Sequence, residues 1–169
     1  MKFESKQQLD GKREFSLLSH DDYELVLVGI KRDTREKYMA KPDKDGKIPL
    51  EEIINFTFEI SGLRDGGIPT DEEGKDAVGR KVFFTGRPDS MGFQQDGTPS
   101  KTRCLVAYAT GQEVEGELDL EEWEALLGRT IYAEIVIYTT EKGQKRNKIS
   151  RFLFPKRSKL PQIDDEDVP

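Results

Sequence analysis

Cysteine and histidine are almost absent from this chain of 169 residues, which contains one of each, Cys104 and His20. A single cysteine excludes a disulfide within the chain. With one histidine as well, a zinc finger, a histidine-rich metal site and a Cys–His catalytic pair are all disfavoured. The sequence therefore predicts neither a bound metal nor a cofactor.

Long apolar runs are missing too. No stretch approaches the ~18 residues that a membrane-spanning helix requires, and residues 1–6 lack the apolar core of a secretion signal. We therefore expect no membrane contact and a protein that is made and kept in the reducing cytoplasm.

The common catalytic motifs are also absent. The sequence has no P-loop, no glycine-rich dinucleotide turn after a strand and no nucleophile elbow. Ser19, His20 and Asp21 are neighbours in sequence, but adjacent side chains in an extended chain point apart and form no triad. We expect a protein that is not an enzyme.

Charge is abundant but uneven. Of the formal net charge of −6, residues 141–159 contribute +7 and residues 160–169 contribute −4, which leaves −9 on residues 1–140. A basic band followed by an acidic end is hidden in the whole-chain value, although partners respond to local potential.

Five segments are predicted to be strands. In residues 53–60, Ile54, Phe56, Phe58 and Ile60 alternate with polar residues, which is the period of a half-buried strand. Similar apolar, β-branched or alternating patterns predict the other strands at 23–30, 81–86, 129–139 and 145–154.

Two short helices are predicted between the third and fourth strands. Thr98 and Pro99 supply an N-cap and a first helical residue, and Gly111 supplies a stop. The second helix is capped by Asp119 and closed by Gly128. Its apolar stripe is expected to consist of Leu120, Trp123, Leu126 and Leu127, with Trp123 in the core.

Three strands, one or two short helices and two more strands form the order of a five-stranded OB-fold barrel. We therefore predict a mainly β chain with an N-terminal arm (1–14), an OB-fold domain (15–156) and a flexible acidic C-terminal tail (157–169).

An OB-fold binds oligonucleotides across its second and third strands, between the loops that join strands one to two and four to five. Both loops are basic here, and aromatic residues accompany them. Single-strand binding combines cations along the phosphates with aromatic faces for the bases. The candidate phosphate contacts are Arg32, Arg35, Lys37, Lys142, Lys145, Arg146, Lys148 and Arg151, and the candidate stacking residues are Tyr38, Phe83 and Tyr138. Alternation allows only one of Phe83 and Phe84 to face solvent.

The C-terminal part of the chain carries a resemblance. Residues 120–155 combine a helix ending at Gly128, a strand, a polar turn, a strand with Asn147-Lys148-Ile149, and Pro155. This pattern resembles the C-terminal half of a family of bacteriophage proteins of unknown function that are thought to be OB-fold single-stranded-DNA-binding proteins. Single-strand-binding proteins also carry acidic tail tips that recruit replication and repair partners, and the matching residues here are Asp164, Asp165, Glu166, Asp167, Val168 and Pro169.

The resemblance implies a largely sequence-independent single-stranded-DNA-binding protein that acts in phage replication or recombination, in the cytoplasm of a bacterial host. Two alternatives stay open. The −9 carried by residues 1–140 favours an OB module that binds a phage or host protein, and sequence does not separate DNA from single-stranded RNA. OB proteins often form dimers or tetramers, so the oligomeric state is open as well.

Overall fold

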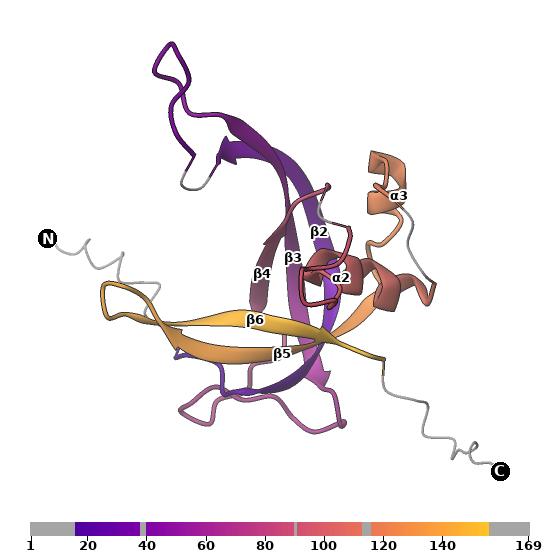
Figure 1. The fold of residues 1–169 in the computed structure, drawn as a ribbon. Coiled ribbons are helices and arrows are strands. Elements are labelled where there is room, and N and C mark those ends of the chain that lie inside the picture. Colours follow the sequence, from indigo (N-terminus) through magenta and orange to yellow (C-terminus); the bar gives the residue numbers. More distant parts are fainter. Residues whose placement is uncertain (1–15, 38–39, 90, 113–115, 156–169) are drawn as a thin grey trace, which may run out of the picture.

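The chain folds around a single β-sheet. The structure, a computed structural model, describes residues 16–37, 40–89, 91–112 and 116–155 (Figure 1). Five antiparallel strands form the sheet in the order β4-β3-β2-β5-β6. The elements are β2 (Asp21–Glu36), β3 (Leu50–Leu63), β4 (Lys81–Gly86), α2 (Lys101–Thr110), α3 (Leu120–Glu124), β5 (Thr130–Thr139) and β6 (Lys145–Leu153). The predicted mainly β chain with two short helices after the third strand is confirmed.

Strand β2 is longer than the sequence predicts. It continues to Glu36, so Arg32 and Arg35 lie on a paired strand and their assignment to a loop was wrong. Charged residues are compatible with a strand here because Arg35 lies directly opposite Glu51 on β3. Such opposite-charge pairs across strands stabilise a sheet by about 0.2–1 kcal/mol each.

The core lies on one face of the curled sheet. The alternating side chains of β3 that were predicted to be buried are at most 1% exposed. Phe56 among them packs against the fully buried Trp123, with 5.6 Å between the ring centroids. Phe84 of β4 meets Phe152 of β6 edge-on at 5.1 Å. The two edge strands of the sheet therefore approach each other.

Helix α2 begins two residues later than predicted. Ser100 is its N-cap, and its hydroxyl accepts a hydrogen bond from the backbone N–H of Arg103 at 3.1 Å. Thr98 does not cap the helix because its hydroxyl donates to Asp96 in the preceding turn, at 2.7 Å. Gly111 ends the helix in the left-handed conformation, with φ of 74°, as expected from its missing Cβ.

Helix α3 shows the predicted cap but is short. The side chain of Asp119 accepts from the N–H of Glu122, and the Glu122 side chain accepts from the N–H of Asp119. This capping box satisfies two helix N–H groups. The helix ends at Glu124, and Trp123 is buried as expected.

Residues 16–19 close one end of the sheet. The side-chain amide of Asn147 on β6 accepts from the N–H of Leu18 at 2.8 Å and donates to its carbonyl at 3.0 Å. Leu18 is thereby fixed in the core. None of the helices in the described residues is long and apolar enough to cross a membrane.

Candidate functional site

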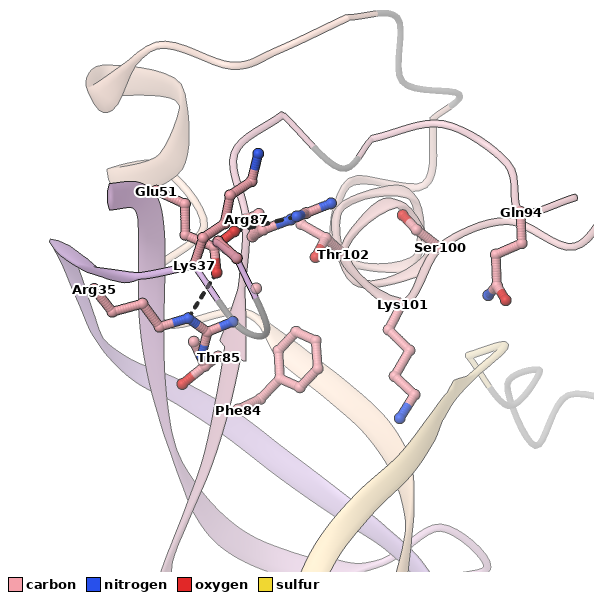
Figure 2. A pocket seen from close by; sticks show the side chains of 12 residues that line it. Arg35, Lys37, Glu51, Phe84, Thr85, Arg87, Gln94, Ser100, Lys101 and Thr102 are labelled. Carbon is pink, nitrogen blue, oxygen red and sulfur yellow. Dashed lines mark hydrogen bonds and ion pairs between the residues drawn. The ribbon is translucent and has the colours of Figure 1, made fainter. Parts of the chain in front are cut away.

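An open cleft of about 860 Å³ lies where β4 ends and α2 begins (Figure 2). Four of its lining residues are cationic and one is a carboxylate. The lining residues are Arg35, Lys37, Ala40, Glu51, Phe84, Thr85, Gly86, Arg87, Gln94, Ser100, Lys101 and Thr102. The cations come from three separate parts of the chain, so the fold concentrates positive charge that the composition does not reveal.

Close packing of α2 on β4 positions this cleft. A Cβ atom on Gly86, the last residue of β4, would lie 2.5 Å from the hydroxyl oxygen of Thr102. Only glycine allows that approach without a shift of the Thr102 side chain or of the helix. The packing brings Lys101, the first residue of α2, and Arg87, the residue that follows β4, into the lining of the same cleft.

Glu51 is the single carboxylate of the cleft, and two arginines hold it. Its Oε2 accepts from Arg35 Nε at 2.9 Å, and its Oε1 accepts from Arg87 Nη1 at 3.2 Å (Figure 2). The hydrogen bond from Arg35 is the main cause that holds the pKa of Glu51 below its ordinary value, with a further contribution from Arg87. Glu51 is therefore ionised at neutral pH.

Lys101 connects the cleft to β6. Its side chain points toward that strand (Figure 2), and its Nζ lies 3.4 Å from the carbonyl oxygen of Ile149. Partial burial lowers the pKa of Lys101, and the nearby positive charge of Lys148 lowers it further. Lys148 is thus electrostatically part of the same basic region.

The hairpin of β5 and β6 continues this region. The ammonium group of Lys148 lies 4.9 Å from the centre of the Tyr138 ring, within the range of a cation–π contact. Arg146 is opposite Tyr138 in the ladder, and its guanidinium donates to Gln144 at 2.9 Å. Three of the predicted binding residues therefore lie together on this hairpin, namely Tyr138, Arg146 and Lys148.

Other predicted cations lie apart from this group. Lys145 precedes Arg146 on β6, so its side chain points to the opposite side of the sheet. Lys142 is exposed in the turn between β5 and β6. Neither lines the cleft.

Besides Arg35, two further predicted phosphate contacts are paired with carboxylates. Arg32 donates to both oxygens of Glu52, at 2.9 and 3.0 Å. Arg151 donates to Glu134 at 2.9 Å. Both positive charges are therefore largely neutralised within the chain.

Glu134 also binds the single histidine. Hydrogen bonds from His20, Ser150 and Arg151, in that order of effect, lower the pKa of Glu134 to about 2. The Nε2 atom of His20 lies 2.8 Å from a Glu134 oxygen. Glu134 lies on β5, Ser150 and Arg151 lie on β6, and His20 directly precedes β2; none of them lines the cleft.

The aromatic candidates take different positions. Phe83 is 67% exposed on β4, opposite Thr57, whereas Phe84 is half-buried and lines the cleft. The prediction that only one of the two faces solvent is confirmed. Tyr38 and the predicted tail residues Asp164, Asp165, Glu166, Asp167, Val168 and Pro169 lie outside the described residues.

Sequence reasoning missed Glu51, Arg87 and Lys101. The predicted contacts come from the loops that join strands one to two and four to five, whereas Arg87 follows the third strand and Lys101 begins a helix. The nearest signal in the sequence is the predicted N-cap at Thr98, because a helix that begins there has Lys101 in its first turn. Only the tertiary packing of Gly86 on Thr102 shows that these residues share a site.

The arrangement is suited to an anionic ligand. Within residues 16–37, 40–89, 91–112 and 116–155, no group of three or more His, Cys, Asp or Glu side chains is placed to hold a metal ion. The cleft offers cationic donors and the half-buried ring of Phe84. Comparison with known proteins finds no family model and no curated protein that matches the chain.

Proposed function

We propose that this chain is a single-stranded-DNA-binding protein whose DNA lies along the basic cleft and the adjoining β5–β6 hairpin. The observation that carries the proposal is that Arg35, Lys37, Arg87 and Lys101, from three parts of the chain, line one cleft that holds a single carboxylate. A polyanion is the ligand class that such a surface attracts, even on a chain with net charge −6, because binding responds to the local potential.

We further propose that the sheet is an OB-type barrel. The strand order, the placement of both helices between β4 and β5, and the approach of the edge strands β4 and β6 support this architecture. In an OB barrel the hairpins corresponding to β2–β3 and β5–β6 frame the ligand. Figure 1 shows these two hairpins as separate projections, β2–β3 at the top and β5–β6 at the left.

Aromatic rings favour a single strand over a duplex. Single-strand binding uses ring faces on which unpaired bases stack, along with cations that follow the backbone. Phe84 lines the cleft, and Tyr138 lies beneath Lys148 on the hairpin. Duplex bases are already stacked on each other and gain nothing from such rings, so the combination favours unpaired nucleotides.

The resemblance of residues 120–155 supports a biological setting in phage DNA replication or recombination. In that setting, the acidic residues 164–167 would recruit replication or recombination proteins to the bound DNA.

Fluorescence anisotropy tests the proposal. Labelled dT oligomers of several lengths are titrated with the full chain at low and moderate salt, with single-stranded RNA and duplex DNA as competitors. We expect binding that strengthens with oligomer length, weakens with salt and is poorly competed by duplex. Stronger competition by RNA would identify an RNA-binding protein, and folded protein that binds no nucleic acid would overturn the proposal in favour of a protein ligand.

A further inference from the structure

We propose that Glu51 occupies the place of a ligand phosphate in the free protein and is displaced when nucleic acid enters the cleft, so that it limits the affinity of the site. This inference rests on the proposed function. It identifies Glu51 as a residue that regulates binding, although it carries the same sign of charge as the ligand.

The geometry around Glu51 matches that of a phosphodiester. Each carboxylate oxygen accepts from a different arginine, Arg35 at 2.9 Å and Arg87 at 3.2 Å. The two non-bridging oxygens of a phosphodiester accept hydrogen bonds from arginines in the same manner. A pair of guanidinium groups spaced for a carboxylate is therefore already spaced for a phosphate group.

Exposure indicates which groups the ligand meets. The side chains of Arg35 and Arg87 are 49% and 43% exposed, whereas that of Glu51 is 11% exposed. Among the described residues, the ion pairs of Arg35 involve Glu51 alone, and Arg87 additionally lies 3.6 Å from Asp89. A DNA strand that enters the cleft therefore meets the two guanidinium groups first and then competes with the less exposed carboxylate for them.

Exchange of the carboxylate for a phosphate needs little new organisation. The two arginines are already oriented and partly desolvated by Glu51, which reduces the cost of ordering them on binding. The bound carboxylate nevertheless competes with the phosphate for the same donors. Glu51 therefore preorganises the site and weakens it at the same time.

The neighbouring residue offers a matched control. Glu52 also forms an ion pair with an arginine, Arg32, at 2.9 Å, but it points to the other side of β3 and does not line the cleft. Neutralising either glutamate changes the net charge by the same amount at adjacent positions. Only the loss of Glu51 frees donors inside the cleft.

The experiment compares the wild-type chain with Glu51→Gln and Glu52→Gln in binding a labelled dT oligomer over a range of salt concentrations. We expect Glu51→Gln to bind about fivefold more tightly at low salt. We also expect the slope of its log affinity against log salt concentration to be steeper by about 0.7–1.4. Glu52→Gln should remain close to wild type in both. Equal behaviour of the two variants, or weaker binding by Glu51→Gln, would overturn the inference while leaving the proposed function in place.

A second measurement uses the wild-type protein and does not depend on the variant's fold. The NMR signal of the Arg35 Nε–Hε group reports its bond to Glu51 and should shift as the dT oligomer saturates the protein. An unchanged signal at saturation would also overturn the inference. Failure of the wild-type chain to bind the oligomer at all would instead remove the proposed function itself.

Discussion

The ammonium group of Lys101 lies 3.4 Å from the backbone carbonyl oxygen of Ile149, so the first residue of α2 bridges to β6. This contact joins two basic groups that the sheet would otherwise keep apart. On one side are the cations around Glu51, and on the other is Lys148 above the Tyr138 ring. The continuous basic path that we propose for a nucleic acid depends on this bridge.

Tyr138 provides a test of base stacking. Tyr138→Leu removes the ring but keeps an apolar side chain, and base–aromatic stacking is worth about 1–3 kcal/mol per base. We expect Tyr138→Leu to weaken binding of a dT oligomer by about five- to hundredfold and Tyr138→Phe to leave it nearly unchanged. Anisotropy titrations measure both. Wild-type affinity in Tyr138→Leu would exclude this ring from the site.

Gly86 links the stability of the fold to the geometry of the cleft. An alanine there would place its Cβ 2.5 Å from the Thr102 hydroxyl, so the Thr102 side chain or α2 itself must shift. We expect Gly86→Ala to lower the free energy of unfolding by about 1–3 kcal/mol and to weaken nucleic-acid binding as Lys101 shifts. Urea denaturation and anisotropy measure the two effects.

A second substitution isolates the cause. In Gly86→Ala/Thr102→Ala the clashing hydroxyl is gone, and the contacts that remain are the milder ones to the Phe84 ring at 3.3 Å and to the Cβ of residue 102 at 3.5 Å. The double variant should therefore be more stable than Gly86→Ala alone, which is the non-additivity expected of residues in contact. A double variant that is less stable by the sum of the single effects would contradict the explanation.

Asn147 is expected to be a major stabilising residue. Asn147→Ala leaves both the N–H and the carbonyl of Leu18 without their side-chain partner, and Leu18 is only 2% exposed. An unsatisfied buried polar group costs about 1–3 kcal/mol, so we expect a loss of about 2–4 kcal/mol in urea denaturation. Asn55→Ala, which removes a bond to the exposed Thr85, serves as the comparison and should cost less than about 1 kcal/mol. Similar losses in the two variants would refute this role.

The lowered pKa of Glu134 predicts a contribution to stability that is lost in acid. Its pKa is lowered from 4.5 to about 2, chiefly by the hydrogen bond with His20. Because the folded-state pKa is the lower one, the carboxylate stabilises the fold above pH 4.5, and this contribution is lost as the pH falls toward 2. Glu134→Gln should therefore be less stable than wild type at pH 7, by about 1 kcal/mol for a partly exposed cluster. The difference should shrink between pH 4.5 and 3, and a difference independent of pH in urea denaturation would contradict the assignment.

Most of the sheet was predictable from the sequence because alternation reports burial directly. Ile54, Phe56, Phe58 and Ile60 alternate, and all four are buried. The extension of β2 was not predictable in this way. Its distal half, up to Glu36, is charged and is held by pairing with β3, a contact that hydrophobic patterning does not record.

The helices, too, were predictable only where a local sequence pattern records the feature. The capping box at Asp119 was readable because its two residues are three apart. The expected apolar stripe of that helix was only partly right, since Trp123 and Leu126 are buried but Leu120 and Leu127 are 48% and 44% exposed. The helix has five residues, which is too short to bury a full stripe.

The candidate site was the least predictable part. Local sequence identified Arg35, Lys37 and Lys148 as cations near strand ends, but it gave no sign that Glu51 neutralises one of them. Nor did it place Lys101 in the cleft, because that requires the close contact of Gly86 and Thr102 across fifteen residues of chain. Spatial convergence of distant segments is a property of the packed fold.

The central claim is that nucleic acid binds in the basic cleft, and paired double variants test it most directly. Lys37→Ala/Lys101→Ala removes two cleft cations, whereas Lys75→Ala/Lys81→Ala removes two exposed lysines that lie outside both the cleft and the two hairpins. Both variants change the net charge from −6 to −8.

The measurement is the dependence of dT-oligomer affinity on salt concentration for wild type and both double variants. We predict that loss of the two cleft lysines weakens binding and reduces the slope of log affinity against log salt by about 1.4, since each phosphate contact on a single strand contributes about 0.7. The control should keep nearly the wild-type slope. Equal slopes and affinities for the two double variants would contradict binding in this cleft.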